Sequence, residues 1–171
     1  MAVAPFLKLT DRSAGRSVAL GFAASFAIAS VSGLFYWLIP WQWNWHASQL
    51  ALIIHLALGL LCLLLWLPYS LIHLRDKDPA WASSLWRWPL LANQPHRRFL
   101  QIAYGGFWLM LLLLLSGLLL SWPALLWLAQ GRAWLWPLGT TELIRWQHLG
   151  LFFAAGAALL AHLPRDREKH K

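Results

Sequence analysis

Residues 99–122 read FLQIAYGGFWLMLLLLLSGLLLSW, and this stretch is the clearest indication of the fold class. It contains no charged side chain, and it exceeds the roughly 20 apolar residues that an α-helix needs to cross the hydrocarbon core of a bilayer. Inside a membrane the backbone must satisfy its own hydrogen bonds, which a helix does within a single segment. We therefore expect residues 99–122 to form a membrane-spanning helix that ends just before Pro123.

Three further segments are also long and mostly apolar, and they cover residues 17–38, 48–74 and 142–163. The composition agrees, because 60% of the 171 residues are hydrophobic and only 12% are charged. A soluble domain carries about twice that charged fraction. The sequence predicts an all-α fold: a polytopic membrane four-helix bundle that forms a single transmembrane domain over residues 1–171.

The lysine and arginine residues predict the orientation of the spans. All but Arg132 and Arg145 lie in the two terminal tails or in the connection between the second and third spans. Because cytoplasmic segments carry the excess of basic residues, we expect both termini on the cytoplasmic side of the membrane. Basic residues placed between spans indicate contact with membrane lipid and not with nucleic acid. The first span is expected to be a retained anchor, since its apolar sequence runs on to Leu38 and is longer than a usual signal peptide core.

Two connections are rich in tryptophan, which favours the boundary between lipid and water. Residues 81–88 lie between the second and third spans, and residues 124–138 lie between the third and fourth. We expect short interfacial helices in both segments, lying along the lipid headgroups. A docking surface for a partner protein is the alternative interpretation.

The two halves of the chain resemble each other. Each half carries a Ser-Gly-Leu element in its first span and two histidines in its second span. These are Ser32-Gly33-Leu34, His55 and His73 in the first half, and Ser116-Gly117-Leu118, His148 and His162 in the second. The bundle is therefore expected to consist of two similar helical hairpins, in which the second and fourth spans run parallel.

An imidazole inside a membrane span is costly enough to suggest a functional site. His55 and His73 are 18 residues apart, which is five helical turns, and His148 and His162 are 14 residues apart, slightly less than four turns. Each pair therefore shares, or nearly shares, one helix face. Two parallel helices of this kind offer two pairs of ligands, His55 with His148 and His73 with His162. Such pairs suit two haem irons with histidine on both sides.

Neighbouring residues fit the same interpretation. Gly33 and Gly117 lie on the spans that would flank the macrocycles, where a missing side chain permits close approach of a flat ring or simply close helix packing. Arg75 follows His73 and Arg145 lies one turn before His148, so both are candidates to pair with haem propionates. The single cysteine of the chain excludes a Cys-x-x-Cys-His attachment site for c-type haem.

Each histidine also has an ordinary structural explanation. His73 and His162 could simply reach for water at the membrane boundary, and His55 and His148 could bridge helices through hydrogen bonds. The spacing in the second span would separate its ligands by about 27 Å, against about 21 Å in the fourth span. A kink at Pro68 would shorten or redirect that path. His46 is the residue that would replace a misassigned ligand.

The elements Leu115-Ser116-Gly117-Leu118 and Gln147-His148-Leu149-Gly150, with His162 closing the last span, carry a family resemblance. Over essentially its whole length the chain resembles the membrane di-haem cytochrome b subunits of bacterial formate dehydrogenase, nickel–iron hydrogenase and thiosulfate reductase. Some of these relatives have a ligand histidine upstream of the Ser-Gly-Leu element, near the positions of Ala19 and Ala103 here.

The resemblance implies a subunit of the respiratory chain in a bacterial inner membrane, with two b-type haems, which passes electrons between quinone in the bilayer and a partner redox protein. Because no segment outside the membrane is long enough to form another cofactor domain, we expect that partner to be a separate protein. A cytochrome c or an iron–sulfur protein is the expected class of partner. Two other functions stay open: a stand-alone transmembrane cytochrome resembling ferric reductases, and a haem-free membrane anchor or assembly subunit.

Overall fold

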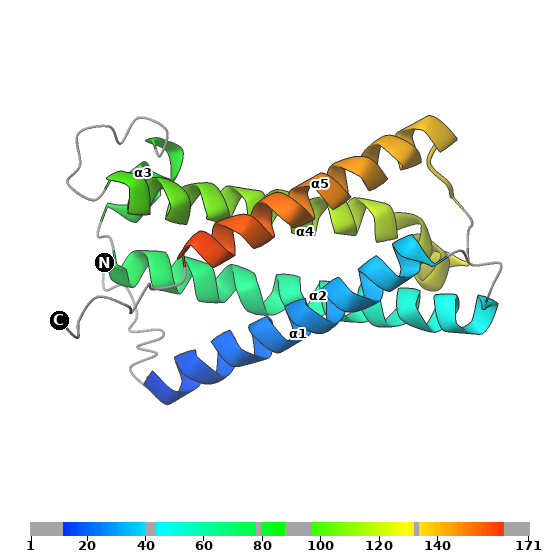
Figure 1. Ribbon diagram of the computed structural model, residues 1–171, viewed down its shortest axis with the longest axis horizontal. Helices are drawn as coiled ribbons and strands as arrows, with labels where there is room; N and C mark the ends of the chain where they lie inside the picture. The colour runs from blue at the N-terminus through cyan, green and yellow to red at the C-terminus, as the bar shows by residue number, and fades with distance from the viewer. Residues whose placement is uncertain (1–11, 40–43, 78–79, 88–96, 132–133, 163–171) are drawn as a thin grey trace. The chain divides into compact units, whose positions relative to one another are not determined.

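A computed structural model describes residues 12–39, 44–77, 80–87, 97–131 and 134–162, and over these residues the regular structure is all helical. The helices are α1 (Arg12–Leu38), α2 (Trp45–Lys77), α3 (Trp81–Arg87), α4 (Arg97–Gln130) and α5 (Leu138–His162) (Figure 1). Four segments are long and apolar enough to cross a bilayer, namely Gly15–Leu38, Trp45–Asp76, Gln101–Gln130 and Leu138–Ala161. The predicted helical class and the four spans are confirmed, and the chain is a multi-pass membrane protein.

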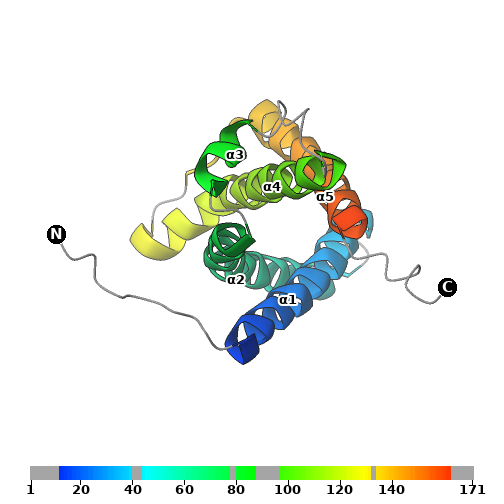
Figure 2. The same cartoon turned by 90° about the vertical axis from the view of Figure 1, so that its left-hand side faces the viewer.

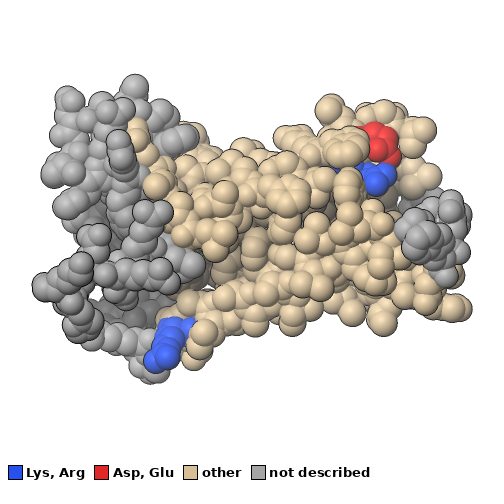
Figure 3. Space-filling view, viewed as in Figure 1, with Lys and Arg blue, Asp and Glu red and all other residues tan. Residues whose placement is uncertain are grey.

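Charged side chains lie only near the ends of the four long helices. No Asp, Glu, Lys or Arg occurs in residues 17–38, 45–74, 99–130 or 146–161, and the visible described surface is almost entirely of other residue types (Figure 3). Large apolar side chains are exposed along the helices, for example Leu64 at 70%, Leu128 at 73% and Leu160 at 73%. Apolar exposure on this scale is unfavourable in water and suits a surface covered by lipid.

The chain divides into two compact units, which separate between Leu74 and Arg75 near the end of α2. In the first unit, α1 and α2 approach each other at two glycines. A Cβ placed on Gly21 would lie 3.7 Å from Leu65 Cδ1, and one placed on Gly33 would lie against His55. Because the residue numbers rise along α1 as they fall along α2, the two helices are antiparallel (Figure 1).

The second unit repeats this arrangement. A Cβ placed on Gly106 would lie 3.5 Å from Ala158 Cβ, and one placed on Gly117 would lie against His148. The two contacts again run in opposite directions along the two helices, so α4 and α5 are antiparallel. Glycine thus allows close helix approach at two levels in each unit.

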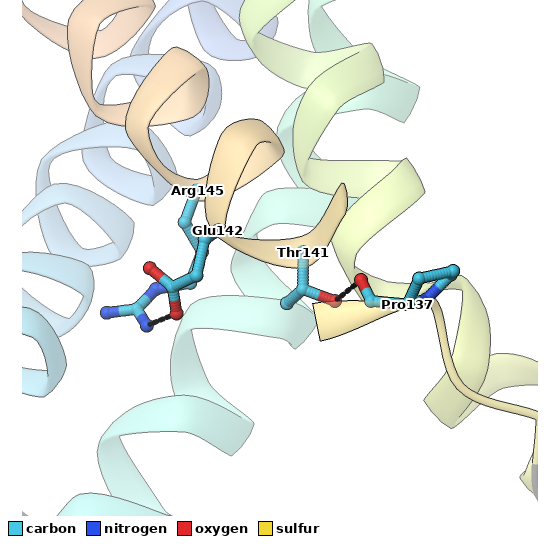
Figure 4. A network of polar contacts seen from close by, with 4 residues as sticks. All are labelled: Pro137, Thr141, Glu142 and Arg145. Atoms are coloured by element: carbon cyan, nitrogen blue, oxygen red, sulfur yellow. Dashed lines mark hydrogen bonds and ion pairs between the residues drawn. The ribbon is translucent and has the colours of Figure 1, made fainter. Parts of the chain in front are cut away.

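The second helix of each unit begins before the apolar sequence does. α2 begins at Trp45 and not near Ser48, because the Asn44 side-chain oxygen accepts a hydrogen bond from the Ala47 N–H at 3.0 Å and caps the helix. α5 begins at Leu138 and not near Glu142. There, the Pro137 carbonyl accepts bonds from the Thr141 N–H at 3.0 Å and the Thr141 hydroxyl at 3.3 Å (Figure 4).

The predicted end of the third span before Pro123 is wrong. α4 continues through Pro123 to Gln130, and Gly131 follows with a φ of 65°, a conformation that favours glycine at a helix C-terminus. A proline inside a helix lacks the N–H that would bond to the carbonyl four residues earlier, here that of Leu119. The Trp136 indole N–H donates to this carbonyl at 3.0 Å. A side chain from beyond the helix therefore replaces the missing backbone donor.

The separate interfacial helix predicted within residues 124–138 is consequently wrong as well. Residues 124–130 are the last turns of α4, residues 134–137 are not helical, and Leu138 already belongs to α5. The sequence interpretation ended the span at the proline. Hydropathy carries no information about a side chain outside the helix that donates to a carbonyl left unpaired by proline.

The short helix predicted near residues 81–88 is confirmed over Trp81–Arg87, and Trp88 lies outside the described residues. α3 packs on α4. The Trp108 indole N–H donates to the Leu85 carbonyl at 2.9 Å, and the rings of Trp86 and Trp108 lie 5.1 Å apart. Figure 2 shows α3 beside α4. Whether this helix lies along the headgroups stays a prediction.

Candidate functional site

The first histidine site consists of Ala29, Gly33 and His55. A Cβ on Gly33 would lie 2.7 Å from both Cε1 and Nδ1 of His55, well inside van der Waals contact, so the imidazole occupies space that only glycine leaves open. His55 Nδ1 lies 2.8 Å from the Ala29 carbonyl oxygen. A carbonyl can only accept, and Nδ1 must therefore carry the hydrogen. The lone pair of the neutral imidazole is then on Nε2.

The second histidine site consists of Ser116, Gly117 and His148. A Cβ on Gly117 would lie 3.1 Å from His148 Cε1. His148 Nδ1 lies 2.8 Å from the Ser116 hydroxyl, and that hydroxyl donates its one hydrogen to the Leu113 carbonyl at 2.8 Å. While the hydroxyl donates to the Leu113 carbonyl, its oxygen can accept the Nδ1 hydrogen. In that arrangement the lone pair of a neutral His148 is also on Nε2.

Both sites thus hold the imidazole in a way that suits metal ligation. A histidine that ligates a metal coordinates through its lone-pair nitrogen and donates its other ring N–H to a carbonyl, hydroxyl or carboxylate partner, which fixes ring orientation and tautomer. His55 and His148 meet these conditions on helices that are otherwise apolar. The donor set suits haem, whose iron takes four nitrogens from the macrocycle and needs only two imidazoles from the protein.

The structure extends the sequence repeat around these two histidines. Each of the helices α2 and α5 begins ten residues before its histidine, at Trp45 and Leu138. Hydroxyl side chains follow at matching positions, Ser48 and Thr141, each seven residues before the histidine. Ser48 is only 2% exposed, and its hydroxyl has no hydrogen-bond partner among the described residues. The sequence interpretation did not find this hydroxyl pair, although the equal spacing to the histidines was its signal.

The roles of Ala29 and Ser116 were also missed. Ser116 was noted only as part of a repeated element, and Ala29 acts through its backbone, which residue type does not reveal. The glycines Gly33 and Gly117 were expected to flank a macrocycle. The structure places each against the histidine of its own unit, while contact with a macrocycle stays a prediction.

Of the terminal histidines, His73 and His162, only His73 has a side chain that the structure describes. His73 is exposed and stacks on Tyr69, with ring centroids 5.8 Å apart and planes inclined by 19°. His162 is the last residue of α5, and its side chain lies outside the described residues. α2 is continuous through Pro68. Counted from His55 and His148, His162 corresponds to Tyr69, and His73 lies one turn further on.

The two arginines considered for propionates are both exposed. Arg145 forms an ion pair with Glu142 at 2.7 Å, with the side chains 45% and 46% exposed (Figure 4). An exposed pair of this kind contributes little to stability, so it leaves Arg145 able to exchange partners. Arg75 is exposed near the end of α2. A propionate role for either residue stays a prediction, as does the use of His46, which is exposed in the first turn of α2.

Among the described residues, no three His, Cys, Asp or Glu side chains gather into a group that could hold a metal ion. A metal site built from protein ligands alone therefore has no candidate in this part of the chain. Comparison with protein families, with characterised proteins and with solved structures found no match. The function must be inferred from the residues of this chain.

Proposed function

We propose that this chain is the membrane electron-transfer subunit of a quinone-linked oxidoreductase, and that it binds two b-type haems. It would be a cytochrome b built from two similar helical hairpins in a bacterial inner membrane, with both termini in the cytoplasm. The observation that carries the proposal is the shared placement of His55 and His148: each ring lies against a glycine, with Nδ1 2.8 Å from an oxygen that can accept its hydrogen. This placement suits the tautomer with the lone pair on Nε2.

Different hydrogen-bond partners lead to the same tautomer, and this favours ligation over simple helix bridging. A bridging histidine needs only some partner, and either ring nitrogen would serve. Here, one ring lies beside a backbone carbonyl and the other beside a serine hydroxyl, and both arrangements are satisfied with the lone pair on Nε2. That nitrogen is what the two sites have in common, and it is the atom that a metal requires.

Different residues would have different roles in binding the two haems. When bound, haem supplies a one-electron carrier. His55 and His148 would ligate one iron, His73 and His162 the other, while Gly33 and Gly117 keep the first two imidazoles in place. Arg75 and Arg145 would offset propionate charge at the ends of the spans. The apolar helices exclude water, and electrons would pass between quinone and a partner such as a cytochrome c or an iron–sulfur protein.

The decisive measurement is the ratio of haem b to polypeptide in the purified, detergent-solubilised protein, by pyridine haemochrome assay. A ratio near two supports both pairs, and a ratio near one means that only one pair ligates. Folded protein made with haem available and containing none would overturn the proposal and leave the haem-free anchor or assembly subunit.

A second experiment separates the two redox functions. We expect a quinol analogue to reduce the haems of protein reconstituted in lipid vesicles. If quinol does not reduce the haems but a ferric chelate oxidises them rapidly, the protein is a stand-alone cytochrome resembling ferric reductases. Reporter proteins fused to each terminus would test the proposed orientation, with activity of a cytoplasmic reporter expected at both ends.

A further inference from the structure

The two histidine sites differ in the group that accepts the Nδ1 hydrogen. His55 donates directly to the Ala29 carbonyl at 2.8 Å. His148 Nδ1 lies 2.8 Å from the Ser116 hydroxyl oxygen, which can accept its hydrogen while the hydroxyl donates to the Leu113 carbonyl at 2.8 Å. Ala29 and Leu113 occupy equivalent places, four residues before Gly33 and Gly117. In the second site the hydroxyl of a buried serine therefore lies between the imidazole and the carbonyl.

Ser32 provides the comparison within the same chain. It precedes Gly33 as Ser116 precedes Gly117, and the two side chains are similarly buried, at 8% and 5% exposure. The Ser32 hydroxyl bonds to the carbonyls of Ile28 at 2.9 Å and Ala29 at 3.1 Å. It therefore shares the carbonyl with His55, whereas Ser116 stands between His148 and the carbonyl.

We infer that Ser116 is a positioning residue for His148 and that it sets the reduction potential of the haem iron that His148 ligates. The inference rests on the proposed function and names a determinant within it. An acceptor for the Nδ1 hydrogen gives the imidazole partial imidazolate character, which makes Nε2 a stronger donor to the iron. A stronger donor stabilises the ferric state over the ferrous state and lowers the reduction potential.

A Ser116→Ala substitution removes this acceptor, and the potential of one haem should rise. A net hydrogen bond is worth about a fivefold change in an equilibrium constant. For a one-electron couple, where tenfold corresponds to about 59 mV, this is a rise of about 40 mV. The measurement is a potentiometric titration of the haem absorbance, with the haem-to-polypeptide ratio determined on the same samples. The ferric EPR spectrum, which responds to hydrogen bonding of an axial imidazole, gives an independent signal.

Ser32→Ala is the matched control. It removes a buried hydroxyl from the equivalent position but leaves the Ala29 carbonyl as the acceptor for His55, so any change in either potential should be much smaller than in Ser116→Ala. Ser116→Thr keeps a hydroxyl and should restore the wild-type potential. Ser116→Cys keeps the volume with a weaker acceptor and should give a smaller rise, which provides the test even if Ser116→Ala fails to retain haem.

Each outcome has a definite meaning. A rise in Ser116→Ala that Ser32→Ala lacks and Ser116→Thr reverses supports the inference. Equal shifts in both alanine variants, or unmoved potentials in the Ala and Cys variants with haem retained, would overturn it while leaving the proposed function in place. Wild-type protein without haem would overturn both.

Discussion

The α1–α2 unit and the α4–α5 unit contain similar histidine sites, but they differ in the spacing to the next histidine and in the position of their prolines. In both, a glycine on the first helix makes room for an imidazole whose Nδ1 donates to that helix. Beyond the site, the next histidine follows after 18 residues in α2 and after 14 in α5. The proline also changes place, since Pro68 lies in the second helix of its unit and Pro123 in the first helix of the other.

This difference shows that residue identity is restricted at the two histidine sites and less restricted elsewhere in the spans. Around His55 and His148, sterics and hydrogen bonding restrict residue identity, so the two units stay alike. Around His73 the ring is exposed and stacked on Tyr69, which restricts identity much less. The comparison predicts that variants of the shared site have larger and more specific effects than variants elsewhere.

The largest effect is expected from the shared histidines. Replacing either His55 or His148 with alanine should remove one of the two haems, because both are assigned to one iron and the site would lose one of its two axial ligands. The pyridine haemochrome ratio would fall from about two to about one in each variant. His46→Ala is the control, because His46 lies nine residues before His55 and hence on the opposite face of α2. Loss of haem in only one of the two variants would show that the units are not equivalent.

Substitutions of His73 and His162 test whether these two histidines form the second ligand pair. Alanine at His73 or at His162 should remove the other haem, leaving a ratio of about one and the spectrum of the haem held by His55 and His148. Tyr69 is the position that corresponds to His162, so Tyr69→Phe serves as the control and should retain both haems. If His73→Ala also retains both, the second pair has been misassigned.

The sequence was sufficient for the helical class and for the number of spans, because apolar length encodes them directly. The ligand roles of the histidines stay predictions. The sequence interpretation failed at Pro123, where the Trp136 indole satisfies the carbonyl that proline leaves without a donor. It also failed to assign roles to Ala29 and Ser116. Both act through hydrogen bonds between helices, and these depend on which helices pack together and at which level. No pattern along one helix contains that information.

Substitutions at Gly33 and Gly117 test how tightly each histidine ring is packed. Gly33→Ala should destabilise the protein by about 1–3 kcal/mol, as overpacking typically does, since the new Cβ would lie 2.7 Å from the His55 ring. Gly117→Ala should cost less, because its nearest distance is 3.1 Å. The free energy of unfolding in mixed micelles measures both effects.

Gly59 and Gly156 supply controls on α2 and α5, since a Cβ there meets no atom of the described structure within 4 Å. Alanine at these positions should be neutral or stabilising by up to about 1 kcal/mol, from helix propensity alone. Equal costs at Gly33 and Gly117, or a cost at Gly59 as large as at Gly33, would contradict the steric account of the sites.

The smallest effect concerns the extension of α4 past its histidine site. Trp136→Phe leaves the Leu119 carbonyl without the indole donor and should destabilise the α4–α5 unit by about 1 kcal/mol. A Pro123→Ala substitution restores the backbone N–H that normally bonds to this carbonyl, so Trp136→Phe should cost much less in that background. A double-mutant cycle of unfolding free energies isolates the coupling. Without coupling, the hydrogen bond from Trp136 does not compensate for the proline, and α4 must tolerate Pro123 by some other means.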